Sequence, residues 1–296
     1  MIFSAKGQFF TSQFPLDNMM VPRNQNTNQG VVTFYFTSAD TVQPANVQIK
    51  KFKDHVFVGT IYPVYVLANV QYEYNISDTI SASLNSYRYE LWYNNVLITK
   101  ADNICSGDFY ILDGQSNAES MPTLDSCYAD YQRFMRTYGN SNELGSKKEW
   151  FVAKCDCNRM IDGCVGQLGV AIANEIILKH LIPVCILNGA VGGKPLNYFL
   201  PDSANHTNLL TSYGRLCTRV HEAHAQSAVR AIIWYQGEND ASICNTQNDY
   251  LNSFHKLFLG WKSDYPNFEN LYLVQIRAGC QTDRYCSNVI QEAQRQ

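Results

Sequence analysis

The sequence has 296 residues, of which 46% are hydrophobic and 17% are charged, and its formal net charge is −3. This length is sufficient for one large domain or two ordinary ones, and the composition excludes a chain that is disordered throughout. The slightly acidic balance argues against nucleic acids and anionic membranes as principal partners.

The sequence shows neither a membrane anchor nor a leader. No apolar stretch approaches the length that a bilayer requires, so we expect no transmembrane segment. Residues 1–15 lack the basic start and the continuous apolar stretch of a signal peptide, which would suit a cytoplasmic protein. We favour a second explanation, in which the natural protein is longer at its N-terminus and works outside the cytoplasm, in a secreted or periplasmic form.

The ten cysteines indicate disulfides rather than a metal site. Cys155 and Cys157 are separated by one residue and no second such pair follows, which does not match the spacing of zinc ligands. We expect buried thiols together with one or two loop disulfides, as in proteins of an oxidising compartment.

Residues 1–104 are predicted to form strands. Stretches rich in Val, Ile, Tyr, Phe and Thr, separated by clusters of Pro, Asn, Asp and Ser, cover residues 31–37, 46–50, 56–75, 79–84 and 87–100. Within the last stretch, Asn94-Asn95 suits a tight hairpin turn because Asn tolerates a positive φ. We therefore expect a small β-sandwich-like domain, or part of one, over residues 1–104.

From residue 105 to residue 296, short apolar stretches alternate with helical patterns. Predicted strands cover residues 108–112, 181–187, 229–235 and 271–276, and predicted helices cover residues 166–180, 208–227, 249–263 and 288–296. This alternation predicts an α/β domain in which helices cover both faces of a parallel sheet. In such sheets the functional residues gather at the carboxyl ends of the strands.

The first of these strands ends in a turn that suits a serine nucleophile. Gly114, Gln115, Ser116 and Asn117 follow the strand directly. A glycine near the serine lets the chain bend sharply and exposes the hydroxyl above the sheet. The alternative is a serine that caps the following helix, and from this segment alone the two interpretations are about even.

Two further loops follow predicted strands. Gly192-Gly193 would let a backbone N–H approach a ligand oxygen closely, as in an oxyanion hole, although a plain turn is the simpler interpretation. After the next strand, the Gln236 amide can donate to a developing oxyanion. Alternatively, Glu238 and Asp240 only cap the helix that follows.

Together these motifs resemble a known family. Gly107-Asp108, Gly114-Gln115-Ser116-Asn117, Gly192-Gly193 and Gln236-Gly237-Glu238-x-Asp240 resemble the sialate O-acetylesterase and acetyl xylan esterase-like carbohydrate esterases of the SGNH-hydrolase superfamily. The resemblance covers about residue 105 to the end. It implies a three-layer α/β/α, flavodoxin-like domain with a parallel sheet, often preceded by a β-sandwich. It also implies hydrolysis of acetyl esters on sugars through an acetyl-enzyme, without a cofactor.

The resemblance implies a role for each matching residue. Ser116 would be the nucleophile, and its N–H, an N–H of Gly192 or Gly193 and the Gln236 side chain would form the oxyanion hole. Supporting residues that shape these loops would be Gln115, Asn117, Glu238 and Asp240.

Two positions depart from the family pattern. The family has its base, a histidine preceded by an aspartate, in a loop after the last helix, and the sequence reaches Gln296 without it. We therefore expect a chain truncated before this loop, with impaired activity, and His206 is the histidine to test as a substitute. Asp113 stands where the family usually has a small or apolar residue, and we expect its carboxylate to be solvated.

The sequence thus favours a carbohydrate O-acetylesterase acting on an O-acetylated carbohydrate. Two alternatives stay open: a catalytically inactive pseudo-esterase that binds glycans, and a cysteine-stapled structural or adhesive protein. The sequence names neither the acetylated sugar nor the oligomeric state.

Overall fold

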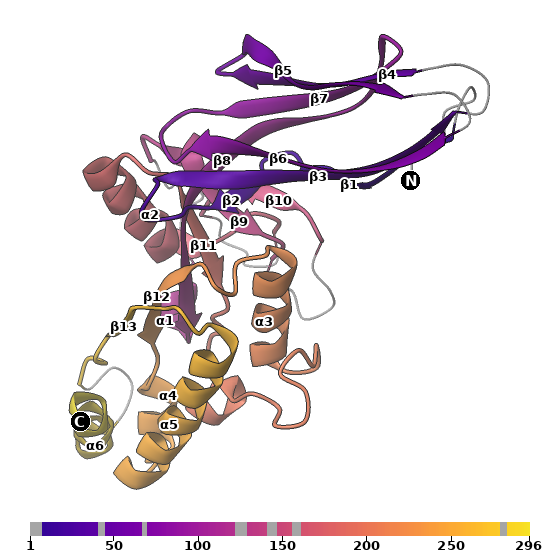
Figure 1. Ribbon diagram of the computed structural model, residues 1–296. Coiled ribbons are helices and arrows are strands. Elements are labelled where there is room, and N and C mark those ends of the chain that lie inside the picture. The colour runs from indigo at the N-terminus through magenta and orange to yellow at the C-terminus, as the bar shows by residue number, and fades with distance from the viewer. Residues whose placement is uncertain are drawn as a thin grey trace. The chain divides into compact units, whose positions relative to one another are not determined.

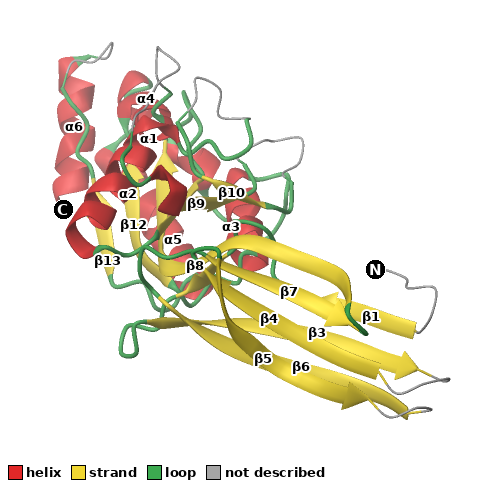
Figure 2. Cartoon of the chain, turned by 90° about the horizontal axis from the view of Figure 1, so that it is seen from above, coloured by secondary structure: helices red, strands yellow, loops and turns green. Residues whose placement is uncertain are grey.

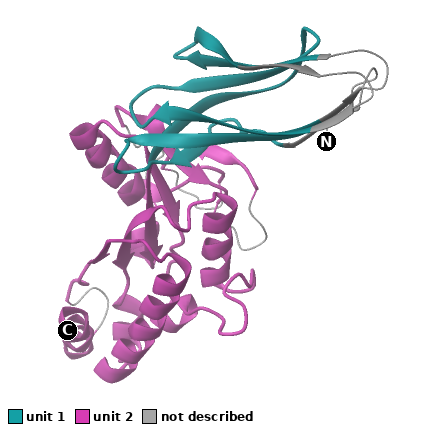
Figure 3. Ribbon diagram, in the orientation of Figure 1, with its two compact units in different colours: residues 1–107 teal, residues 108–296 magenta. Residues whose placement is uncertain are grey.

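The chain folds into two compact units. The computed structural model describes residues 8–40, 45–66, 70–121, 129–140, 147–155, 161–278 and 283–296. Contacts between backbone positions divide the chain into Met1–Gly107, unit 1, and Asp108–Gln296, unit 2 (Figure 3). Strand β8 (Val96–Gly114) spans this boundary, so its first part belongs to unit 1 and its last part to unit 2.

Unit 1 consists of strands. One antiparallel sheet has the order β1 (Gln8–Gln13), β3 (Gln29–Asp40), β6 (Val70–Ser81). A second antiparallel sheet has the order β8, β7 (Tyr87–Tyr93), β4 (Ala45–Lys53), β5 (Val56–Val66). The short strand β2 (Met20–Pro22) pairs in parallel with residues 105–107 of β8.

The two sheets of unit 1 share one hydrophobic core. Alternate residues of β3, including Phe34, and of β7, including Tyr89, are buried in the same cluster. The rings of Phe34 and Tyr89 meet edge to face with their centroids 5.1 Å apart. This pattern follows from the period of two along a strand, which directs every second side chain to the same face.

The strands of unit 1 differ from the sequence prediction in two ways. Strands β1 and β2 were not predicted. The predicted strand 56–75 is two strands, β5 and β6, and the predicted strand 79–84 is the end of β6, which stops at Ser81. A single strand of that length would exceed the usual range, which is a reason to expect a break. The hairpin prediction is confirmed: Asn94 and Asn95 have φ values of 47° and 62° between β7 and β8.

Unit 2 is an α/β unit built on a mostly parallel sheet. Its strands have the order β10 (Trp150–Val152), β9 (Met135–Tyr138), β11 (Val184–Asn188), β8, β12 (Val229–Tyr235), β13 (Asn270–Leu273). All pairs are parallel except β10 with β9. Strands β9 and β10 were not predicted, because they are short and β9 (Met-Arg-Thr-Tyr) carries no continuous apolar pattern.

The helices of unit 2 are α1 (Ser116–Glu119), α2 (Gly166–His180), α3 (Ser212–Glu222), α4 (Glu238–Ser242), α5 (Gln247–Asp264) and α6 (Arg284–Arg295). Two short 3₁₀ helices, η1 (Gln132–Phe134) and η2 (Leu196–Phe199), complete the unit. The helix predicted for residues 166–180 has the observed bounds. None of the helices in the described ranges is long and apolar enough to cross a membrane.

Helices cover both faces of the parallel sheet. Neighbouring residues of β11 point to opposite faces of the sheet. Ile186 faces α2, where a Cβ added to Gly169 would contact it. Cys185 faces α3 and lies near Arg219. On the second face, Trp234 of β12 packs edge to face on Trp261 of α5. Figures 1 and 2 show the strands of unit 2 between these helices, so the α/β prediction for this region is confirmed.

One disulfide lies beside the carboxyl edge of the sheet. Cys244, just after α4, is bonded to Cys286 of α6, with 42 residues of sequence separation. Cys155 is also disulfide-bonded, whereas Cys105, Cys164, Cys185 and Cys217 are buried thiols. A mixture of disulfides and buried thiols is what the sequence predicted.

The disulfide should stabilise unit 2 by limiting the entropy of its unfolded chain. For a loop of this length, removing the bond should lower the free energy of unfolding by about 4 kcal/mol. Urea unfolding followed by tryptophan fluorescence measures this loss. C244S, C286S and the double variant should all lose the same amount, and an unchanged midpoint and slope in all three would contradict the expectation.

Candidate active site

The turn after β8 requires a glycine and presents Ser116. Gly114 has a φ of 136°, and a Cβ at this position would overlap the carbonyl oxygen of Tyr235 on β12. The Gln115 N–H donates to the same Tyr235 carbonyl, at 3.0 Å. Ser116 is then the first residue of α1, and its side chain is exposed.

Ser116 does not cap the helix that it begins. The N-cap residue is Gln115, and no side-chain hydrogen bond caps the helix. Among the described residues, neither the Ser116 hydroxyl nor the Ser116 N–H has a hydrogen-bond partner. The capping interpretation is therefore wrong, and the serine has an accessible hydroxyl next to an unpaired backbone donor.

The Gly192-Gly193 loop lies directly against Ser116. A Cβ on Gly192 would be 3.6 Å from the Ser116 Cβ. Asn188, buried at the end of β11, fixes this arrangement, because its Nδ2 donates to Ala118 O at 3.1 Å and to Val165 O at 2.9 Å. Its Oδ1 accepts the Ala190 N–H at 2.9 Å. One amide therefore joins α1, the start of α2 and the glycine loop.

The two glycine N–H groups differ. The Gly192 N–H donates to Glu119 Oε2 at 3.0 Å. The Gly193 N–H has no acceptor in the part of the chain that the structure describes, and Gly193 is exposed with a φ of 69°. Of the two donors that the sequence left open, Gly193 is the one available to a ligand.

The structure places the Gln236 amide inside the protein. Gln236 is fully buried, and its Nε2 donates to Asp240 Oδ2 at 2.5 Å and to Lys194 O at 3.2 Å. A longer hydrogen bond, of 3.3 Å, runs from the same nitrogen to Gln115 Oε1. The amide thus ties the loop after β12 to the other two loops, and its donors are directed at protein acceptors.

Asn239 is the residue of this loop that the sequence interpretation missed. It is half-buried, and its Nδ2 donates to Gly193 O at 3.1 Å. An amide side chain two residues after Gly237 was visible in the sequence. However, a sequence cannot tell which of two amides in one short loop points outward.

The four supporting residues come together around these loops. Gln115 Oε1 accepts the Asn239 N–H at 3.1 Å, and Asn117 Nδ2 donates to Glu238 Oε1. Asp240 is buried and accepts the Leu196 N–H at 2.8 Å. These hydrogen bonds connect the turns after β8, β11 and β12.

None of the six histidines, which all lie in described ranges, is hydrogen-bonded to Ser116. His206, the histidine that the sequence singled out for testing, bonds through Nδ1 to Asp264 Oδ2 at 2.8 Å, and the Tyr213 hydroxyl donates to the same oxygen at 2.6 Å. His221 contacts Cys217 Sγ at 3.6 Å. Among the described residues, no group of three or more His, Cys, Asp and Glu side chains could hold a metal ion.

The expectation that Asp113 is solvated is wrong. This residue is 2% exposed, because it lies on the face of β8 that α3 covers. Burial raises its pKa from 3.8 to about 7, although its Oδ1 accepts the Gly114 N–H at 2.8 Å, which works in the opposite direction. The carboxyl group therefore lies below the turn that carries Ser116 and is directed into the core.

These loops match those of a known family. The profile of the family described as carbohydrate esterase, sialic acid-specific acetylesterase matches residues 106–296, more than half of the chain. The chain belongs to this carbohydrate esterase family. Ser116, Gly193 and Asn239 all lie within the matched residues.

One solved structure has a fold similar to that of this chain. A carbohydrate acetylesterase from Xanthomonas citri has a TM-score of 0.56 at 18% identity, over 95% of this chain and 64% of that chain. The chain thus spans less than two thirds of that protein. A protein from Arabidopsis thaliana has a TM-score of 0.45 at 18% identity, over 63% of this chain and 79% of its own.

A family two carbohydrate esterase from Cellvibrio japonicus gives a TM-score of 0.36 at 12% identity, over 98% of this chain and 85% of its own. A search of curated proteins found no match.

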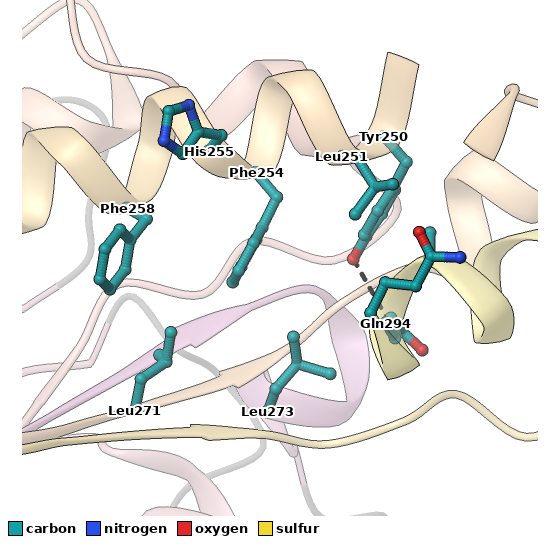
Figure 4. A pocket seen from close by; sticks show the side chains of 10 residues that line it. Tyr250, Leu251, Phe254, His255, Phe258, Leu271, Leu273 and Gln294 are labelled. Atoms are coloured by element: carbon teal, nitrogen blue, oxygen red, sulfur yellow. Dashed lines mark hydrogen bonds between the residues drawn. The ribbon is translucent and has the colours of Figure 1, made fainter. Parts of the chain in front are cut away.

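A separate cavity of about 340 Å³ lies between α5, β13 and α6 (Figure 4). Its lining is mostly apolar, with Phe254 and Phe258 from α5 facing Leu271 and Leu273 from β13. At one end, Gln294 Nε2 donates to the Gln236 carbonyl at 2.7 Å. The cavity therefore lies behind the loop after β12, and Ser116 is not part of its lining.

Burial of Asp113 should make the stability of the protein depend on pH. The folded state holds the proton up to about pH 7, whereas the unfolded chain releases it near the ordinary aspartate pKa of 3.8. The contribution of Asp113 to the free energy of unfolding is therefore fully present below pH 3.8. As the pH rises from 3.8 to 7, the free energy of unfolding falls by up to about 4 kcal/mol. Asp113→Asn should remove this loss while retaining an oxygen for the Gly114 N–H.

The free energy of unfolding of both proteins, measured by urea titration between pH 4.5 and 8, tests this expectation. The difference between Asp113→Asn and the unsubstituted protein should grow with pH in favour of the variant. A difference that is the same at all pH values would show that Asp113 does not hold its proton in the folded state.

Proposed function

We propose that this chain hydrolyses O-acetyl esters of carbohydrates, with Ser116 as the nucleophile. The observation that carries the proposal is the exposed Ser116 hydroxyl beside two backbone N–H groups, those of Ser116 and Gly193, that have no acceptor among the described residues. Unpaired donors beside a nucleophile are what an acyl-transfer site requires, because the attacked carbonyl oxygen becomes negative.

In the proposed reaction, Ser116 Oγ attacks the acetyl carbon and its proton passes to a base. The tetrahedral oxyanion accepts hydrogen bonds, the sugar hydroxyl leaves with a proton, and the acetyl group stays on Ser116. Water then attacks the acetyl-enzyme and releases acetate. No cofactor takes part in these steps.

We assign the third oxyanion donor to Asn239 instead of Gln236. The Asn239 amide bonds to Gly193 O, on the residue whose N–H is unpaired, whereas the Gln236 amide is buried among protein acceptors. Gln236, Gln115 and Asp240 then act as supports that hold the loop.

We further propose that the 296-residue chain is a weak esterase by itself. A serine hydroxyl at its ordinary pKa needs an adjacent base. None of the six histidines, all of which lie in described ranges, bonds to Ser116. A small base supplied in solution should therefore accelerate the reaction.

For the substrate, we propose an O-acetylated acidic sugar of the sialic acid type. The description of the matching family includes sialic acid, and Lys194 directly follows Gly193. Within the described residues, the Lys194 ammonium forms no ion pair and lies 4.9 Å above the Tyr198 ring. A cation next to the oxyanion loop would attract a substrate carboxylate.

We also propose that the protein works in an oxidising compartment outside the cytoplasm. The Cys244–Cys286 disulfide and the disulfide-bonded Cys155 support this, because disulfides are rare in reducing compartments.

The alternative function is a pseudo-esterase that binds glycans without hydrolysing them. The observation that favours it is that none of the six histidines, all in described ranges, is hydrogen-bonded to Ser116.

The nucleophile is tested by chemical rescue with imidazole. Imidazole should raise the hydrolysis of 4-methylumbelliferyl acetate by the chain at least tenfold over the reaction of imidazole alone, since a positioned base contributes roughly 10²–10⁴-fold. Ser116→Ala should remove this increase. The unsubstituted chain and Ser116→Ala are then compared on two natural substrates, O-acetylated sialic acid and acetylated xylan. The release of acetate is measured, which compares an acidic sugar with a neutral one.

Equal rates for the chain and Ser116→Ala at every imidazole concentration would contradict the esterase proposal. If both proteins nevertheless bound the acetylated sugar in calorimetry, the result would favour the glycan-binding alternative.

The assignment of Asn239 is tested by substitution. Asn239→Ala should lower the imidazole-supplemented kcat by roughly 10²–10³-fold with little change in KM, because an oxyanion donor acts in the transition state. The matched control is Asn197→Ala, an exposed asparagine of η2, which should leave the rate unchanged. A rate for Asn239→Ala within twofold of the unsubstituted chain would return the donor role to another residue.

A further inference from the structure

We propose that Glu119 is a positioning residue for the oxyanion loop: its carboxylate holds the Gly192 N–H, so that the next N–H, of Gly193, faces the acyl oxygen. The inference rests on the proposed function, because it concerns the same site. It adds a residue that neither the family motifs nor the sequence analysis singled out.

The backbone of Glu119 is fixed from several sides. Glu119 ends α1, three residues after Ser116, so the two side chains lie on the same face of the helix. Gly166, at the start of α2, packs so closely that a Cβ there would overlap the Glu119 carbonyl oxygen. The Gln167 N–H donates to Ser120 O at 2.8 Å. The carboxylate is therefore presented from a rigid support.

The carboxylate reaches the glycine loop at its first residue. Glu119 Oε2 accepts the Gly192 N–H at 3.0 Å, and a Cβ on Gly192 would be only 2.7 Å from that oxygen. Glycine at position 192 thus lets the carboxylate approach the main chain. A hydrogen bond to an ionised acceptor is roughly twice as strong as one between neutral groups, which suits the task of fixing a loop.

Other residues fix the far end of the same loop. Gly193 O accepts from Asn239 Nδ2 at 3.1 Å, and Lys194 O accepts from Gln236 Nε2 at 3.2 Å. With Glu119 at one end and these amides at the other, the peptide plane between Gly192 and Gly193 has little freedom to rotate. The orientation of the Gly193 N–H, which a ligand oxygen would use, then depends on Glu119.

The chemistry of this contact separates two roles that Glu119 could have. If Glu119 positions the loop, any side-chain oxygen at the same place should serve, and the negative charge near the developing oxyanion is tolerated. If instead the carboxylate occupies the oxyanion site and blocks it, removing the carboxylate should accelerate the reaction.

The kinetic test uses 4-methylumbelliferyl acetate with imidazole, after subtraction of the Ser116→Ala rate. Glu119→Ala should lower kcat about 10- to 100-fold with KM within twofold, because a misdirected donor is lost in the transition state. Glu119→Gln, which keeps an oxygen for the Gly192 N–H, should stay within about threefold of the unsubstituted chain. Glu175→Ala, an exposed glutamate of α2, is the matched control and should be unchanged.

A second measurement does not depend on turnover. In spectra of protein labelled with ¹⁵N-glycine, the Gly192 amide should exchange with solvent slowly in the unsubstituted chain and in Glu119→Gln, and at least tenfold faster in Glu119→Ala. Added acetate, the reaction product, should shift the Gly193 amide more than the Gly192 amide, and this response should be lost in Glu119→Ala.

Unchanged or faster turnover in Glu119→Ala, or unchanged exchange of its Gly192 amide, would overturn the positioning role. If the chain shows no Ser116-dependent turnover at all, the proposed function fails, and the exchange and acetate measurements still decide the role of Glu119.

Discussion

The parallel register of β8 with its two neighbours is the constraint on which the site depends. Leu112 of β8 is paired with Asn188 of β11, and Gly114 is paired with Tyr235 of β12. Because the three strands run in the same direction and end at the same edge, the turns that follow them must meet. Gly114 permits the closest of these approaches, since a side chain there would collide with the Tyr235 carbonyl.

Buried polar side chains tie the three turns to one another. Three buried side chains each form a hydrogen bond with the backbone of a different turn. Asn188 donates to Ala118 O, Gln115 accepts the Asn239 N–H, and Asp240 accepts the Leu196 N–H. A buried polar group that loses its partner costs about 1–3 kcal/mol, so this network is stable only when every turn is in place. The same interdependence explains why the orientation of one glycine N–H can be set by Glu119, a residue on another turn.

The sequence predicted much of this architecture because it rests on patterns that sequences display. The apolar strands 108–112 and 229–235 and the helix 166–180 carried clear periodicity, and the motif residues stood at strand ends. What the sequence could not supply was the direction of individual side chains. Gln236 and Asn239 are both amides of one loop, and only the structure separates the buried one from the half-exposed one. Asp113 was misjudged for the same reason, since a polar residue at a strand end gives no sign of which face it takes.

The central claim is that three turns aim hydrogen-bond donors at one point beside the Ser116 hydroxyl. A crystal structure of the chain with methylboronic acid, which mimics the tetrahedral intermediate of an acetyl ester, tests it most directly. We expect a bond from boron to Ser116 Oγ, and a boron-bound oxygen within hydrogen-bonding distance of the Ser116 and Gly193 nitrogens and Asn239 Nδ2. An adduct whose oxygens point away from these nitrogens would contradict it.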